Sequence, residues 1–143
     1  MSQLFLAGAA DIFADSNFPW TKGLNPALVT EAHIYARHIR STKPNAMIGV
    51  LFQNDVLGKP FLKGIRERLG SGHGDMIVKE GSYEVYDPTV DSQIVAIQGA
   101  GADTLVIVSA PKPAAQAIRK AVRYWLDAST ALVQRLGLDP YHF

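Results

Sequence analysis

The chain has 143 residues, the length of one ordinary domain, of which 48% are hydrophobic and 19% charged. This composition is typical of a folded globular domain and excludes an intrinsically disordered chain. With 14 Lys and Arg against 13 Asp and Glu, the net charge of +1 gives no reason to expect a nucleic-acid partner. The absence of cysteine excludes disulfides, thiolate zinc sites and cysteine nucleophiles.

The first 25 residues predict a short strand followed by an irregular connector. Residues 4–7 are apolar, and the stretch that follows is rich in turn-forming residues. The apolar start lacks the basic segment of a secretory signal, and no run of about 18 apolar residues predicts a membrane span. We therefore expect a cytoplasmic protein if this sequence is the whole product.

Three alternations of a strand and a helix come next. The first and third predicted strands are apolar runs bounded by turn residues, and the second is a strand region interrupted at Gly81. The predicted strands cover residues 47–52, 76–85 and 104–108. Runs of this kind are typical of strands that are buried on both faces of a parallel sheet.

Apolar residues at helical spacing predict a helix after the connector and one after each of these strands. Asn25 with Pro26, and Asp87 with Pro88, have the pattern of a helix cap followed by a first-turn proline. The predicted helices cover residues 26–41, 57–69, 88–98 and 111–136. The last is unusually long because no helix breaker precedes Gly137.

This order predicts an α/β fold with three layers, in which a Rossmann-like open parallel sheet carries helices on both faces. The sheet is expected to be incomplete, because so few strands are present. We treat residues 1–143 as a single domain with three parts. These are a strand and connector (1–25), a core (26–121) and a divergent helix and tail (122–143).

In such sheets, ligands bind outside the carboxyl ends of the strands. Those ends fall at residues 53–57, 85–89 and 109–112, and two carboxylates, Asp55 and Asp87, lie among them. Each of these residues can either cap the following helix or contact a ligand, and the sequence leaves both roles open.

No catalytic arrangement emerges from the remaining residues. The chain has no Walker phosphate loop and no Gly-x-Ser-x-Gly turn. His33 and His38 are five residues apart on one predicted helix, on different faces, which disfavours a shared metal. We predict a protein that is not an enzyme and has no catalytic residue, cofactor or metal.

Several stretches carry a resemblance to a known family when their order and spacing are considered together. They are residues 18–21, 30–36, 48–55, 58–64, 82–85, 87–94, 101–103 and 114–121. Over residues 3–121, the chain resembles the type 1 periplasmic substrate-binding proteins of ABC transporters. The likeness is greatest to the branched-chain amino acid (leucine-binding) group.

The resemblance implies one part of a receptor whose two lobes close on a solute, with this chain carrying mainly the first part of the second lobe. In the family, ligand contacts come from the loops after the first two strands of that lobe. They correspond to Asp55, Leu57, Tyr86 and Asp87. An aromatic residue often stands where this chain has Leu57, and an acid near Asp87 helps to hold the ammonium group of an amino acid.

The resemblance further implies an amino acid or a similar small carboxylate as solute, the membrane subunits of an ABC transporter as partners, and a periplasmic location. Beyond Ala121 the likeness ends, so we predict a truncated lobe with weak or no ligand binding. The exposed edges and apolar faces of an incomplete sheet, together with the apolar residues of the long last helix, predict a homodimer. Two alternatives remain open: an oligomeric regulatory module without a ligand, and a small flavodoxin-like enzyme that uses Asp55 and Asp87.

Overall fold

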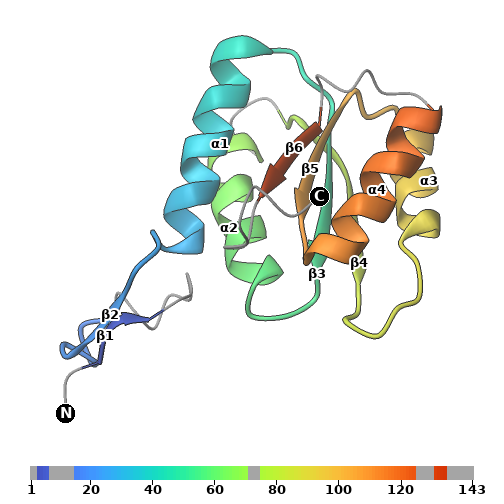
Figure 1. Ribbon diagram of the computed structural model, residues 1–143. Coiled ribbons are helices and arrows are strands. Elements are labelled where there is room, and N and C mark those ends of the chain that lie inside the picture. Colours follow the sequence, from blue (N-terminus) through green and yellow to red (C-terminus); the bar gives the residue numbers. More distant parts are fainter. Residues whose placement is uncertain (1–2, 7–14, 71–74, 125–130, 135–143) are drawn as a thin grey trace.

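The computed structural model of the protein describes residues 3–6, 15–70, 75–124 and 131–134 (Figure 1). In chain order, its elements are β1 (Gln3–Leu6), β2 (Thr21–Gly23), α1 (Leu28–Thr42), β3 (Ile48–Gln53), α2 (Gly58–Leu69), β4 (Ile77–Tyr83), α3 (Asp91–Gly99), β5 (Thr104–Val108), α4 (Pro111–Tyr124) and β6 (Ala131–Gln134).

A parallel sheet with the strand order β4-β3-β5-β6 forms the centre of the fold. Every residue of β5 is buried, and so is every residue of β3 except Phe52, which is partly buried. The continuous apolar runs are therefore explained by burial on both faces. The predicted α/β class and the parallel arrangement of the strands are confirmed.

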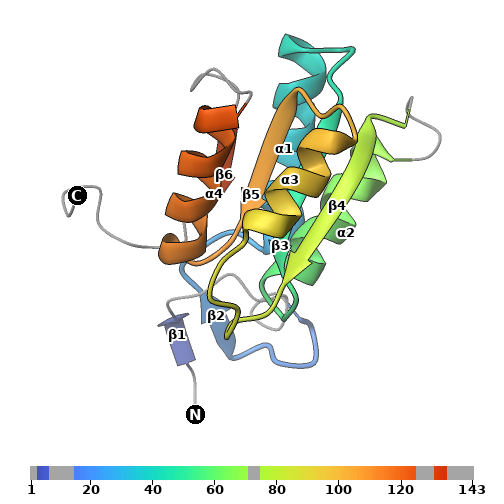
Figure 2. The same cartoon turned by 90° about the vertical axis from the view of Figure 1, so that its right-hand side faces the viewer.

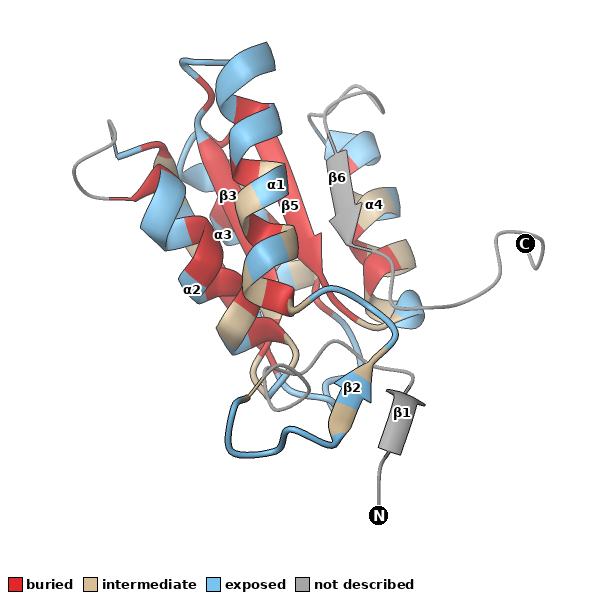
Figure 3. Ribbon diagram, turned by 90° about the vertical axis from the view of Figure 1, so that its left-hand side faces the viewer, coloured by how far each residue is buried: buried red, intermediate tan, exposed pale blue. Residues whose placement is uncertain are grey.

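Two pairs of helices cover the sheet, with α1 and α2 on one face and α3 and α4 on the other (Figures 1 and 2). The alternation of side chains along β5 divides the core between these faces. Val106 and Val108 pack with the α1–α2 side, whereas Leu105 and Ile107 pack with the α3–α4 side. Figure 3 shows that burial is concentrated on β3, β5 and the inner sides of the helices.

Helices α1 and α2 lie in close contact because small residues meet between them. A Cβ on Gly64 would lie 2.7 Å from the Cβ of Ala32 and 2.9 Å from the carbonyl oxygen of Val29. Next to this contact, the rings of Tyr35 and Phe61 meet edge to face, with centroids 5.6 Å apart. The helix pair therefore packs as one layer against the sheet.

The prediction of one long last helix over residues 111–136 is wrong. Helix α4 ends at Tyr124, and residues 131–134 form β6, which pairs in parallel with β5. Three consecutive apolar residues fit a buried strand as well as a helix, and the free edge of β5 decides between them. The sheet thus gains a fourth strand. Of the predicted divergent part, residues 125–130 and 135–143 lie outside the described residues.

Two predicted helix starts are also wrong. Helix α1 begins at Leu28 after Ala27, which has no side-chain capping bond, so Asn25 is not its cap. Helix α3 begins at Asp91, and the hydroxyl oxygen of Thr89 accepts a hydrogen bond from its backbone N–H at 3.2 Å. In both cases the proline precedes the helix by two or more residues and lies outside any helix or strand. Strand β4 runs through Gly81 without the predicted interruption.

The N-terminal strand forms a separate small parallel pair with β2, in which Gln3 lies opposite Thr21. The predicted strand over residues 4–7 is confirmed as far as Leu6, and residues 7–14 lie outside the described part. Among the described residues, no helix combines the length and the apolar character needed to cross a bilayer.

Candidate functional site

The carboxyl ends of β3, β4 and β5 meet at one edge of the sheet, together with the starts of α2, α3 and α4 (Figure 2). We call this the strand-end edge. It carries the turn at residues 54–57, the turn at residues 84–87 and the short connection at residues 109–110. The topology therefore brings together the loops in which ligand contacts were predicted.

Asp55 holds the turn at residues 54–57 in place. One carboxylate oxygen accepts hydrogen bonds from the backbone N–H groups of Leu57 at 2.8 Å and Gly58 at 3.2 Å. The other accepts a hydrogen bond from the side-chain amide of Gln53. Asp55 thus accepts hydrogen bonds from the N–H groups at the start of α2. This role is close to the helix capping that the sequence predicts for it.

The electrostatic state of Asp55 follows from these contacts. Partial burial opposes ionisation, but the hydrogen bonds from Gln53, Leu57 and Gly58, together with the charge of Lys59, outweigh it and lower the pKa of Asp55. An ionised carboxylate that is already hydrogen-bonded is a weak proton acceptor. Its place in the turn therefore favours a structural over an acid–base role.

A buried polar pair lies beneath this turn. Tyr83, the last residue of β4, is 2% exposed, and its hydroxyl donates a hydrogen bond of 3.0 Å to the side-chain oxygen of Gln53, which is 9% exposed. Burial raises the pKa of Tyr83, and the negative charge of Asp55 adds to this effect, whereas hydrogen bonds with Ser109 and Ala110 oppose it. The phenol is therefore a stable neutral donor.

The second turn, at residues 84–87, is closed by its own terminal residues. The N–H of Asp87 donates to the carbonyl oxygen of Glu84 at 3.0 Å, and the N–H of Glu84 donates to a carboxylate oxygen of Asp87 at 2.9 Å. The expectation that Asp87 caps the third helix is wrong, because its carboxylate closes this turn instead. Tyr86, at the tip, is 95% exposed.

A direct bond joins the two turns. The side-chain amide of Asn54 donates to a carboxylate oxygen of Glu84 at 2.6 Å, and the N–H of Asn54 donates to the carbonyl oxygen of Tyr83 at 2.9 Å. Of the four predicted contact residues, Tyr86 and Asp87 are exposed, Asp55 is bonded within its turn, and Leu57 packs partly buried against the core. Val56 stands at the tip of the first turn and is 78% exposed.

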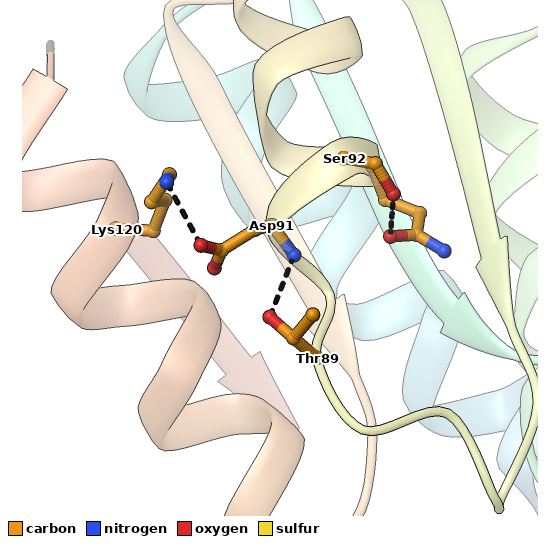
Figure 4. Close-up of polar contacts among 5 residues, drawn as sticks. Thr89, Asp91, Ser92 and Lys120 are labelled. Carbon is orange, nitrogen blue, oxygen red and sulfur yellow. Dashed lines mark hydrogen bonds and ion pairs between the residues drawn. The ribbon is translucent and has the colours of Figure 1, made fainter.

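The start of α3 is tied to α4 on the other side of the strand-end edge (Figure 4). Lys120 Nζ lies 2.8 Å from a carboxylate oxygen of Asp91 and 4.9 Å from the ring centre of Tyr124. The hydrogen bond from Lys120 lowers the pKa of Asp91. Gln116 adds a bond of 3.1 Å to the carbonyl oxygen of Pro88, so this loop is anchored to α4 at two points.

Gln53 and Asn54 fall within the predicted loop at residues 53–57, but sequence reasoning assigned them no role, and Tyr83 and Glu84 lie outside the predicted loops. The available signal was position in the sequence. Gln53 and Asn54 directly follow the apolar run at residues 47–52, and Tyr83 lies near the end of the next predicted strand. The carboxyl ends of adjacent parallel strands lie side by side, so the parallel topology predicts that these residues are neighbours. The hydrogen bonds themselves depend on the register of β3 with β4, in which Gln53 lies opposite Tyr83.

At the strand-end edge, the exposed side chains include those of Val56, Tyr86 and Asp87. Two shallow hollows lie on other parts of the molecule, one lined by β4 together with Arg66 and Asp75, and one on α2 beside Lys59 and Lys63. Within the described ranges, no group of three His, Asp or Glu side chains is placed to hold a metal ion. A ligand at this edge needs a second wall for enclosure.

No family model and no curated protein matches the chain. Solved structures do match. A periplasmic binding protein from Burkholderia mallei is 15% identical with a TM-score of 0.74, and the match covers 96% of this chain and 36% of that protein. An extracellular ligand-binding receptor from Rhodopseudomonas palustris is 19% identical with a TM-score of 0.77, covering 93% of this chain and 36% of the receptor.

A third match is a branched-chain amino acid ABC transporter periplasmic ligand-binding protein from Burkholderia xenovorans. It is 17% identical with a TM-score of 0.73, and the match covers 92% of this chain and 35% of that protein. At such identities the likeness shows the fold, which is that of a lobe of these binding proteins. The chain spans about a third of their length. They are described as binding proteins and receptors, as the resemblance in the sequence predicts.

Proposed function

We propose that the chain forms the ligand-covering side of a solute receptor, and that the strand-end edge faces the solute. The observation that carries this proposal is the pair of turns at residues 54–57 and 84–87. They lie at the carboxyl ends of neighbouring parallel strands, are bonded to each other through Asn54 and Glu84, and present exposed side chains. The shared fold with known binding proteins supports it.

Within this edge, Tyr86 and Asp87 make the direct ligand contacts. Tyr86 offers an exposed aromatic face, and the carboxylate of Asp87 offers negative charge to an ammonium group. Asp55 and Leu57 contribute by shaping the turn from which Val56 projects. The solute is an amino acid or a related small carboxylate, which the intact receptor would deliver to an ABC importer from the periplasm.

One lobe by itself offers only part of the contacts and none of the enclosure that make such sites tight. The proposal therefore predicts weak binding for this chain. Titration of isotope-labelled protein with L-leucine, L-phenylalanine and acetate up to millimolar concentrations, followed by NMR, tests it. Tyr86→Ala and Asp87→Asn should abolish the shifts, whereas the control Asp75→Asn, at the opposite end of β4, should leave them unchanged.

The role of Asp55 favours this binding function over the flavodoxin-like enzyme. An acid–base pair formed by Asp55 and Asp87 would need free carboxylates that exchange protons near neutral pH. Asp55 instead accepts three hydrogen bonds and has a lowered pKa, so one member of that pair is already committed to its turn.

The homodimer stays a prediction, but the part of it that depends on a long last helix does not hold. Leu132 and Val133 belong to β6 and pair with β5, so they do not form a helical surface. The reason that remains is the sheet itself, since β4 and β6 are its two edge strands among the described residues. Light scattering across micromolar concentrations distinguishes a dimer from a monomer.

A further inference from the structure

The amide of Gln53 has a defined orientation because its two neighbours differ in what they can donate. The ionised carboxylate of Asp55 only accepts hydrogen bonds, so the NH₂ group of Gln53 must face it. The side-chain oxygen is then left to face the hydroxyl of Tyr83, which donates to it at 3.0 Å. Removing the tyrosine hydroxyl would leave a buried acceptor without this donor.

The orientation of the Gln53 amide in turn fixes the Asp55 carboxylate in the turn that follows β3. The Asp55 carboxylate that Gln53 holds accepts hydrogen bonds from the N–H groups of Leu57 and Gly58. Gly58 in turn lies against the backbone of Gln53, where a Cβ would lie 1.9 Å from the carbonyl oxygen. The turn at residues 54–57 is therefore held at both ends by Gln53.

We infer that Tyr83, a buried residue of β4, is a positioning residue for the turn that ends β3, and that it acts through Gln53 and Asp55. Together with the Asn54–Glu84 bond, this connection joins the turns at residues 54–57 and 84–87 into one hydrogen-bonded unit. The importance of the unit for ligand contact rests on the proposed function, but its existence does not.

The first test uses Tyr83→Phe, which removes only the hydroxyl and keeps the buried ring. Hydrogen exchange of the Leu57 and Gly58 N–H groups should become about tenfold faster, as expected when a side-chain hydrogen bond is lost. The pKa of Asp55, followed by NMR, should rise because Gln53, without the bond from Tyr83, is held less firmly against the carboxylate. Gln53→Glu should raise the pKa of Asp55 further than Tyr83→Phe does, since it places a second carboxylate against Asp55.

The control is Glu80→Gln, on the same strand. It weakens the ion pair with Arg66, which lies in the last turn of α2, at the other end of that helix from Leu57 and Gly58. It should leave both the Leu57 and Gly58 exchange rates and the Asp55 pKa unchanged. The inference is overturned if Tyr83→Phe leaves those exchange rates within about twofold of the unmodified protein. It is also overturned if Tyr83→Phe accelerates all core amides equally, since that result indicates a general loss of stability.

Ligand titration separates this inference from the proposed function. If L-leucine shifts signals at the strand-end edge, Tyr83→Phe should weaken that binding although Tyr83 is only 2% exposed. If no probe binds the unmodified protein, the proposed function fails. The exchange rates and the Asp55 pKa would still decide whether Tyr83 positions the turn.

Discussion

Gly58, the first residue of α2, lies directly on the carbonyl oxygen of Gln53, the last residue of β3. A Cβ at position 58 would be 1.9 Å from that oxygen, a separation that no side chain can occupy without backbone movement. The turn from β3 into α2 is this tight because the carboxylate of Asp55 accepts hydrogen bonds from the N–H groups of Leu57 and Gly58, where the helix begins. Gly58 therefore has a steric function at the strand-end edge.

We predict that Gly58→Ala lowers the free energy of unfolding by about 2 kcal/mol or more, within the usual range for overpacking against a rigid neighbour. Gly99→Ala is the matched control, because a Cβ there has no neighbour within 4 Å. It should be neutral or slightly stabilising. Urea denaturation measures both, and equal stability of the two variants would contradict the steric argument.

Asp55 should make the stability of the protein depend on pH in the acid range. Its folded pKa is lowered, so its contribution is present above the ordinary carboxyl pKa of about 4 and is lost as pH falls through the folded pKa. Asp55→Asn should therefore be less stable than the unmodified protein at pH 7, and the difference should shrink toward pH 3. A difference in unfolding free energy that stays constant over this range would show that the charge of Asp55 is not responsible.

Phe61 anchors α2 in the core between α1 and the sheet. It is fully buried and meets Tyr35 edge to face. Phe61→Ala should cost about 3–5 kcal/mol of unfolding free energy, as is usual when a buried aromatic side chain is truncated. Val95→Ala, at a half-exposed position of α3, should cost far less. Thermal or urea unfolding of the pair checks this, and similar losses would place Phe61 outside the core.

Strand β6 can be tested without any substitution. Residues 131–134 should show the backbone chemical shifts of extended structure, and amides in the β5–β6 ladder should exchange slowly. Helical shifts over the same residues would contradict the four-stranded sheet and restore the long last helix.

The centre of this fold could be predicted from the sequence because burial on both faces leaves continuous apolar runs. The runs at 47–52 and 104–108 are short and bounded by turn residues, which favours strands, and the structure places them at β3 and β5. Residues 131–134 could not be assigned in this way. Their apolar run fits two conformations, and the choice depends on β5, which is remote in sequence.

The strand-end edge could be predicted only in outline. Its location follows from the parallel topology, and Asp55 and Asp87 fall within it. The bonding partners depend on side-chain positions that topology does not determine, such as the direction of the Asp87 carboxylate toward Glu84. Tyr83 is a buried residue at the end of its strand, and nothing in the sequence distinguishes its hydroxyl from that of an ordinary core tyrosine.

The central claim, that the strand-end edge of this chain contacts a small solute, is tested most directly by the NMR titration with millimolar L-leucine. The account predicts shifts confined to residues 54–58 and 84–89, which are lost in Asp87→Asn. The absence of shifts with L-leucine, L-phenylalanine and acetate, or shifts located on other surfaces, would contradict it.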